Sequence, residues 1–540
     1  MMISEIFLRK DCLNFRPMRR LTRVLQKAAR VALARLDAWF NALYTWRYNP
    51  LYHSGALVVA CFLVLLATGL YLLLFYRIGS PYASVARITD QALTGRWIRT
   101  LHRYVSDLAV AAMLVHAVRM FVQGRSWGPR ALAWVSGVVL AFVFFVCGWT
   151  GYVMVWDGQA HLLAAEGARL FDALPIFSEP ISRAFIGDDA VPPAFFFLNL
   201  FAHIALPVGV ALILWIHVSR LARSYLMPPK PLLWGMVGLF TAASVIWPMG
   251  MDAPADLLRL PGDVSLDLFY GFWLPASLSA GAGWVWLAFL AVMGASLAVP
   301  LFQRPPKEKA PLPSVVNARF CTGCEQCYHD CPYEAIDMVP RSDGRDGFVA
   351  WVNDTKCVSC GICSASCAPM GVGPPQRTGR DQISEVKAFL ERARPGADDV
   401  VLVACANSAA GGDFFLDAPV YPVSCTGSLH TSVLEYLVRA GAGGVMVVAC
   451  PPRDCWNREG VKWLEERVDN GREAELKPRV DRRRIRIVYA AEGESLRLAA
   501  ELHAYRQDLT ALDRAQGEDD IVIDVLCEVP EVSVAEEAAR

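Results

Sequence analysis

Four histidines lie in two pairs of equal spacing within the apolar first part of the sequence. His102 and His116 are fourteen residues apart in one apolar segment, and His203 and His217 are fourteen apart in another. Fourteen residues is nearly four helical turns, so each pair lies on one helix face, its members about 21 Å apart. In parallel helices His102 then faces His203 and His116 faces His217, which suits two bis-imidazole b hemes. Lipid-facing histidines, or histidines satisfied within a core, are the alternative.

Glycines and arginines support the same interpretation. Two glycine pairs in the other apolar segments repeat the spacing of fourteen: Gly55 and Gly69, Gly137 and Gly151. A macrocycle wedged between helices needs neighbours without side chains at its height, although such glycines also serve helix packing. Arg99 precedes His102 by three residues and Arg119 follows His116 by three. Each arginine can pair with a heme propionate, and positive-inside anchoring is the alternative.

Twelve of the sixteen cysteines lie between Cys321 and Cys455. Eight form two runs of the pattern C-x₂-C-x₂-C-x₃-C, which is typical of iron–sulfur ligands, with zinc as the alternative: Cys321, Cys324, Cys327 and Cys331, then Cys357, Cys360, Cys363 and Cys367. Four more end or follow predicted strands and should meet at one sheet edge as a metal site: Cys405, Cys425, Cys450 and Cys455. We expect Cys12, Cys61, Cys147 and Cys527 to be unliganded.

The composition places these residues in a membrane part and a soluble part. Hydrophobic residues make up 54% of the chain and charged residues 19%, which is too apolar for an ordinary soluble protein. Equal numbers of basic and acidic residues, 52 each, exclude a nucleic-acid binder. Six segments are long enough to span a membrane: 54–76, 101–121, 131–155, 195–218, 231–250 and 276–302.

Loop charge predicts the orientation of the spans. Residues 1–50 contain ten Lys and Arg against three acids, and residues 18–40 read as an amphipathic helix on the membrane surface. The loops 119–130 and 219–230 are basic, whereas 156–193 and 252–267 are acidic; only 77–100 dissents. We therefore expect a multi-pass protein of the bacterial inner membrane with both termini in the cytoplasm. A reducing cytoplasm agrees with clustered, metal-binding cysteines, and no cleavable signal peptide is evident.

The last part of the chain alternates short apolar runs with amphipathic ones, which predicts a parallel sheet with crossover helices. The predicted strands are Val400–Ala404, Val420–Val423, Gly444–Ala449 and Ile485–Tyr489, and the predicted helices are 428–440, 459–469 and 495–509. The expected domains are a basic tail 1–50, a membrane domain 51–303, a stiff linker 304–315, a cysteine-rich domain 316–380, an α/β domain 396–510 and an acidic tail 511–540.

The membrane part resembles cytochrome b of the bc-type respiratory complexes. The matching stretches are Trp97–His102, His116–Arg119, Gly151–Trp156 and His203–His217, within residues 35–300. The resemblance implies a diheme helical bundle, with a possible homodimer. The family's outer quinol-site motif Pro-Glu-Trp-Tyr is absent from residues 261–270, which puts quinol bifurcation in doubt. Asp263 and Asp267 are candidates for serving a quinone there, with surface solvation as the alternative.

The cysteine runs resemble bacterial two-cluster ferredoxins. That resemblance assigns Cys321, Cys324, Cys327 and Cys367 to one [4Fe-4S] cluster and Cys357, Cys360, Cys363 and Cys331 to the other. The stretch Gly443–Cys455, with Cys450-Pro-Pro-Arg-Asp-Cys455, resembles the delta subunit of methyl-viologen-reducing hydrogenase. This second resemblance implies a [2Fe-2S] cluster on Cys405, Cys425, Cys450 and Cys455. The family often has further cysteines after the first ligand, and here Cys405-Ala-Asn-Ser has none.

The predicted fold is therefore multidomain, with a six-span transmembrane bundle, an α+β two-cluster ferredoxin and an α/β parallel-sheet domain. We expect the electron-transfer subunit of a membrane quinone-dependent oxidoreductase, without a substrate-converting residue of its own. Electrons would pass between a cytoplasmic flavoprotein or dehydrogenase and quinone through one [2Fe-2S], two [4Fe-4S] and two b hemes. The alternatives are a docking subunit for a hydrogenase or heterodisulfide-reductase-type complex that uses a soluble carrier, and a redox sensor or assembly scaffold.

Overall fold

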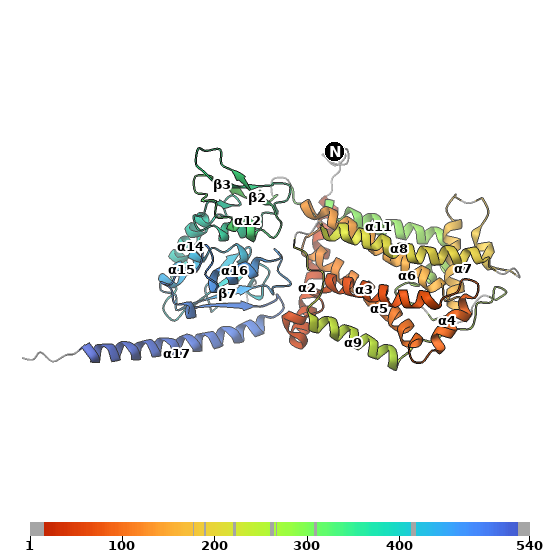
Figure 1. Ribbon diagram of the computed structural model, residues 1–540. Helices are drawn as coiled ribbons and strands as arrows, with labels where there is room; N and C mark the ends of the chain where they lie inside the picture. Colours follow the sequence, from red (N-terminus) through yellow and green to blue (C-terminus); the bar gives the residue numbers. More distant parts are fainter. Residues whose placement is uncertain are drawn as a thin grey trace, which may run out of the picture. The chain divides into compact units, whose positions relative to one another are not determined.

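The computed structural model describes residues 16–176, 178–187, 191–219, 223–259, 264–265, 267–306, 310–411 and 417–527. It divides into two compact units, Met1–Pro311 and Leu312–Arg540. The first unit is helical, and the second contains all the described strands (Figure 1).

Five helices of the first unit are long and apolar enough to cross a membrane. They are α3 (Ser54–Phe75), α5 (Gly95–Val122), α6 (Ala131–Val153), α8 (Pro193–Ser219) and α11 (Ala282–Gln303). The segment predicted at 231–250 is also a helix, α9 (Lys230–Ile246), but it has only 17 residues. It ends there because Pro248 disfavours helical geometry at the preceding Trp247, whose φ and ψ are −123° and 69°. Five of the six predicted spans are thus found at full length.

The remaining helices of this unit flank the long ones. They are α2 (Arg16–Tyr48), α4 (Pro81–Asp90), α7 (Gly158–Asp172) and α10 (Leu274–Ala280), with short 3₁₀ turns at Gly128–Arg130 and Ile181–Phe185. Helix α2 contains the amphipathic stretch predicted at 18–40 and continues to Tyr48 across a kink at Thr45, whose φ and ψ are 60° and 162°.

Helix pairs form the core of the bundle. Helix α3 packs along α5, and α6 packs along α8. Small residues such as Ala60 and Ala109, which are at most 1% exposed, allow the first pair to approach closely. Large apolar side chains such as Leu70, Trp215 and Leu290 are at least 60% exposed on the outside of the bundle. An apolar exterior of this kind is expected of a surface that faces lipid.

The second unit begins with a small α+β region. Strand β1 (Val315–Val316) pairs antiparallel with β4 (Val372–Gly373), and β2 (Ile336–Pro340) pairs antiparallel with β3 (Phe348–Val352). Two one-turn helices, α12 (Gln326–Asp330) and α13 (Ile362–Ser366), each contain the third cysteine of a run and end just before the fourth. Helix α14 (Gly379–Ala393) follows, with a Thr378 and Asp381 capping box at its start.

A four-stranded parallel sheet of order β6-β5-β7-β8 completes the unit. The strands are β5 (Val400–Cys405), β6 (Val420–Val423), β7 (Gly444–Ala449) and β8 (Ile485–Tyr489), as predicted to within one residue. Helices α14, α15 (Thr431–Arg439) and α16 (Gly460–Asp469) pack on one face, and α17 (Ser495–Cys527) packs on the other. Helix α17 runs well past residue 509, so much of the predicted acidic tail is helical.

Candidate cofactor sites

The first histidine pair, His102 and His203, is brought together from α5 and α8. The two imidazole rings lie 6.4 Å apart between centroids, with an angle of 58° between their planes. Gly69 of α3 lies beside His102, and a Cβ at that position would come within 3.3 Å of the ring. Gly151 of α6 lies beside His203, where a Cβ would be 2.8 Å from Cε1.

The second histidine pair, His116 and His217, repeats this arrangement on the same helices. The two side chains lie close enough to interact electrostatically. A Cβ at Gly55 would come within 2.9 Å of the His116 ring, and one at Gly137 within 3.3 Å of the His217 ring. Each of the four histidines thus lies beside one of the four glycines that share the spacing of fourteen residues.

Helix hydroxyls fix the orientation of three of these imidazoles. Thr68 Oγ1 lies 2.8 Å from His102 Nδ1 and donates its own proton to Val64 O, so it accepts a hydrogen bond from the ring. Ser136 Oγ likewise donates its proton to Leu132 O and accepts a hydrogen bond from His217 Nδ1 at 2.9 Å. His203 Nδ1 donates to Cys147 O at 2.9 Å, with Thr150 Oγ1 at 3.0 Å.

This tautomer leaves Nε2 as the atom without a proton, which is the one available to a metal. Paired, half-buried imidazoles, three of them with a hydrogen-bonded Nδ1, flanked by glycines at which a side chain would be crowded, fit a heme at each level.

The two arginines predicted beside the hemes have protein partners. Arg99 donates to Met249 O at 3.1 Å and to Gly250 O at 3.2 Å. Arg119 is buried, forms an ion pair with Asp37 of α2, and lies over the Tyr52 ring at 4.7 Å. Propionate binding by either arginine therefore stays a prediction.

Site A comprises Cys321, Cys324, Cys327 and Cys367, and these four thiols line one pocket. Burial, together with the other three thiols, raises the pKa of Cys327 to about 12. The Gly371 amide donates to Cys367 Sγ at 3.2 Å. Four neighbouring thiols that raise one another's pKa would be stabilised as thiolates by the iron atoms of an iron–sulfur cluster.

Site B comprises Cys331, Cys357, Cys360 and Cys363. Burial raises the pKa of Cys360, and its three companions add to the effect. Ser314 donates its amide to Cys357 Sγ at 3.4 Å, and its hydroxyl lies 3.3 Å from Cys363 Sγ. The Ala335 amide donates to Cys331 Sγ at 3.3 Å. Each set thus contains three thiols from one run and the fourth from the other, as the ferredoxin resemblance implies.

Site C comprises Cys405, Cys425, Cys450 and Cys455, all at most 3% exposed. Cys405 ends β5, Cys425 lies two residues beyond β6, and Cys450 follows β7. Cys450 contacts the thiols of Cys405 and Cys455, and Cys455 also contacts Cys425. The predicted convergence at the carboxyl edge of the sheet is therefore observed.

Gly460 closes site C from α16, because a Cβ there would lie 3.1 Å from Cys425 Sγ. Among the described residues, no three His, Cys, Asp or Glu side chains surround the position of a single ion.

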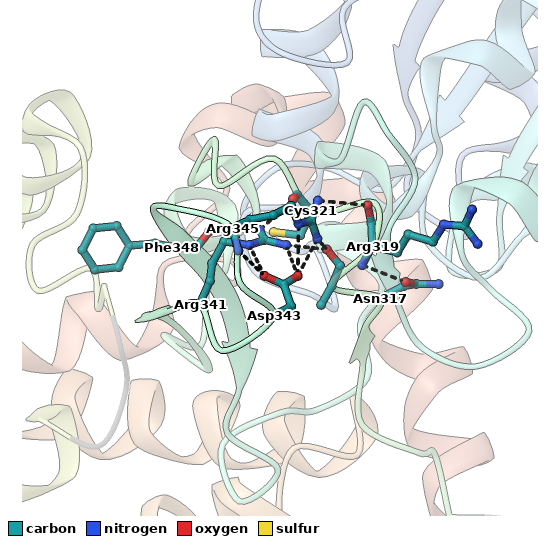
Figure 2. Close-up of polar contacts among 8 residues, drawn as sticks. Asn317, Arg319, Cys321, Arg341, Asp343, Arg345 and Phe348 are labelled. Carbon is teal, nitrogen blue, oxygen red and sulfur yellow. Dashed lines mark hydrogen bonds and ion pairs between the residues drawn. The ribbon is translucent and has the colours of Figure 1, made fainter.

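An arginine clamp around Cys321 was not anticipated from the sequence (Figure 2). Arg341 donates to Cys321 O at 2.9 Å and to Ala318 O at 2.8 Å, and Arg345 also donates to Ala318 O at 2.5 Å. Both guanidinium groups pair with Asp343 and hold the pKa of that carboxyl well below its usual range. The clamp fixes the turn that carries Cys321, the first cysteine of site A.

The histidine-orienting hydroxyls were also missed, although the sequence contains a signal for them. Thr68, Ser136 and Thr150 each directly precede one of the four glycines, and Ser54 precedes the remaining one, Gly55. A hydroxyl residue before glycine, repeated at every histidine level, is the pattern that could have identified them.

Three family models match the chain in the predicted order. Cytochrome b/b6/petB matches residues 42–224, a 4Fe-4S dicluster domain matches 320–371, and the delta subunit of methyl-viologen-reducing hydrogenase matches 417–513. The first match contains both histidine pairs and all four glycines. The third contains Cys425, Cys450 and Cys455, whereas Cys405 precedes it.

Two individual proteins illustrate the similarity. Cytochrome b6 of Mastigocladus laminosus is 29% identical over 184 residues, which is 34% of this chain and 86% of that protein. A chain of a hyperthermophilic respiratory Complex III has 19% identity and a TM-score of 0.38, covering 46% of this chain and 75% of that one.

Proposed function

We propose that this protein links a cytoplasmic redox enzyme to quinone. The chain joins cytochrome b, 4Fe-4S dicluster and hydrogenase-delta-like parts in one multi-pass membrane electron-transfer protein. Electrons pass between a flavoprotein, a dehydrogenase or a heterodisulfide-reductase-type subunit at site C and the quinone pool. The two histidine pairs carry this proposal, because two stacked ligand levels are needed to move charge across a bilayer and not merely to anchor a soluble module.

Bound heme b and iron–sulfur clusters supply the one-electron carriers of this pathway. The protein residues hold and orient them: Nδ1 hydrogen bonds fix the imidazoles, glycines leave space beside them, and amide-to-sulfur bonds such as Gly371 to Cys367 stabilise negative charge on the thiolates. With the soluble unit in the cytoplasm, electron movement between the two histidine levels couples to the membrane potential, at about 2.3 kcal/mol per charge per 100 mV.

A polar cluster next to the first histidine pair supports a quinone site at that level. Arg103, adjacent to His102, forms an ion pair with Asp267, and Tyr152 donates to Asp267 Oδ2 at 2.7 Å. The Asp267 side chain is 9% exposed, and the Arg103 guanidinium lies 4.2 Å from the Tyr152 ring centroid. A buried carboxylate that contacts a phenol can pass protons to or from a quinone oxygen. Asp263 lies outside the described residues.

Quinone reoxidation of reduced heme tests the proposal. In membranes reduced with dithionite and freed of excess reductant, added quinone should reoxidise the b-type heme. Asp267→Asn should slow this step while leaving the heme content unchanged, and Asp256→Asn, at an exposed loop carboxylate, is the matched control. Heme that stays reduced after quinone addition would exclude the quinone link.

The two-level assignment has a separate test. His116→Ala should lose the heme of the second histidine pair and retain that of the first, as read from heme content and redox titration. Loss of both hemes from a folded protein would contradict two independent levels. With the shorter helix α9 as a sixth crossing, we also infer that both termini lie in the cytoplasm at the bacterial inner membrane, and reporter fusions at each end test that orientation. The cytochrome b resemblance further suggests a homodimer, which cross-linking in native membranes would detect.

A further inference from the structure

Three separate contacts join the surroundings of site B to the surroundings of site C. The first is made by Arg377, which lies just before α14. Its Nη2 donates to Ser359 O at 2.7 Å and to Ser359 Oγ at 2.8 Å, while its Nη1 donates to Ser424 Oγ at 3.4 Å. Ser359 directly precedes Cys360 of site B, and Ser424 directly precedes Cys425 of site C. One guanidinium therefore bridges the neighbours of two ligands.

The second contact is a close approach between loops. Gly361, between two site B cysteines, has φ +80°, and a Cβ there would lie 3.0 Å from Ser428 Cβ. Ser428 in turn donates to Cys425 O at 2.8 Å. The absence of a side chain and the left-handed conformation both favour glycine at this position. The ligand loops of sites B and C thus pack directly against each other.

The third contact comes from the other end of site C. Arg458, three residues after Cys455, donates to Pro332 O at 3.0 Å, and Pro332 directly follows Cys331 of site B. Each end of site C, at Cys425 and at Cys455, is therefore tied to a segment that carries a site B ligand.

Site A also meets the α/β domain, because Arg472 donates to Gln326 Oε1 at 2.6 Å and Arg467 donates to Ser366 Oγ at 3.4 Å, but neither arginine lies in a loop that carries a site C cysteine. Cys321 is held by the clamp of Arg341 and Arg345, and its described hydrogen bond comes from within the α+β region. Of the four site A residues, Cys367 meets the α/β domain, where its carbonyl lies 3.3 Å from His430 Nε2. Cys321 and Cys324 are only half-buried beside their pocket.

A buried ion pair makes the joint between the two regions rigid. Arg467 of α16 is fully buried and donates to Gly427 O at 2.9 Å, with the Asp330 carboxylate 3.6 Å away. Asp330, which directly precedes Cys331, is 1% exposed and also pairs with Arg472 at 2.6 Å. A buried ion pair resists separation of its two side chains, because separating them would leave a buried charge without a partner.

From these contacts we infer that site B is the direct electron partner of site C, that site A comes after site B, and that Arg377 is a positioning residue for the B–C step. One electron leaves site C, which is oxidised, as site B is reduced by one electron, and no bond forms or breaks. A flavoprotein or dehydrogenase replenishes site C. This order rests on the cluster assignments of the proposed function, but it is independent of quinone.

Paramagnetic relaxation in the full chain tests the order at equilibrium. In dithionite-reduced protein, the EPR signal of the site C cluster should relax fast because a reduced site B cluster is its nearest neighbour. Cys360→Ser, which impairs site B, should slow that relaxation several-fold, whereas the matched Cys324→Ser at site A should leave it nearly unchanged. The reverse pattern, or equal effects, overturns the order.

Arg377→Gln tests the positioning role, with Arg392→Gln at an exposed position of α14 as its control. The Arg377 variant should keep wild-type iron and sulfide content but show a several-fold weaker magnetic interaction between sites B and C, and Arg377→Lys should restore part of it. An unchanged interaction in Arg377→Gln would refute the role. Iron and sulfide contents too low for three clusters in the wild type would instead refute the cofactor assignment.

Discussion

Replacing Gly151 by alanine should disturb the first histidine pair and leave the second intact. The new Cβ would lie 2.8 Å from His203 Cε1, which is closer than side-chain carbons normally approach. The ring cannot simply turn aside, because its Nδ1 is tied to Cys147 O at 2.9 Å. Overpacking of this kind costs about 1–3 kcal/mol. If the apoprotein gives up this hydrogen bond to relieve the contact, and heme binding requires the ring in its original place, the whole cost falls on heme binding, about fivefold to more than a hundredfold in affinity.

The assay combines heme content with redox titration of purified protein. Wild-type protein should contain two b hemes per chain, and Gly151→Ala should show partial loss of one heme or a shift of one potential. Gly55→Ala, with a 2.9 Å approach to His116, should affect the other heme instead. Gly209→Ala is the control, since a Cβ on that glycine of α8 meets nothing within 4 Å. Two full hemes with unshifted potentials in Gly151→Ala would refute the glycine argument.

Three further variants probe other contacts. Arg467→Leu should lower the free energy of unfolding of the second unit by about 3–5 kcal/mol in urea titrations. Adding Asp330→Leu should recover much of this loss, because no buried charge is then left without a partner. A double variant that is less stable than the single one would contradict an ion-pair origin. Thr68→Val should weaken heme binding at His102 by about 10–100-fold in heme titrations while Thr68→Ser does not, and equal binding by both would contradict the second-sphere role. Asp343→Asn should speed iron loss from site A by a factor that is constant between pH 5 and 8. Because the folded-state pKa of Asp343 is depressed, its contribution is complete above the unfolded pKa near 3.9 and disappears only as pH falls through the lower folded value, so a factor that varies across pH 5–8 would contradict the clamp.

The long helices and the parallel strands could be predicted because their signals are local. A run of apolar residues about 20 long specifies a spanning helix whatever lies beside it, and β5 and β7 read as strands because all of their residues are apolar or glycine and buried. Helix α9 shows the limit of this reasoning. Its apolar run continues to Ile246 and beyond, but the backbone restriction imposed by Pro248 stops the helix first.

The convergence of site C could also be predicted, since parallel strands place their carboxyl ends at one edge. The joint between sites B and C could not. Arg467 and Asp330 are 137 residues apart in the sequence, and each resembles an ordinary charged residue of an amphipathic helix. Their burial results from the way α16 meets α12, which depends on tertiary packing and on no local pattern.

The hydroxyls that orient the histidines lie between these two cases. Successive helix residues are about 100° apart around the axis, so a hydroxyl one position before a glycine sits at the edge of the gap which that glycine leaves. An imidazole filling the gap presents its Cε1 and Nδ1 to this edge, and His102 and His217 meet Thr68 and Ser136 there. The repeated hydroxyl-glycine pair is therefore visible in the sequence. Its role in orienting a histidine can be recognised only once the partner helix and the height of its histidine are known. By the same rule we expect Ser54, which precedes Gly55, to orient the His116 ring, so a Ser54→Ala variant should weaken heme retention at the second pair alone.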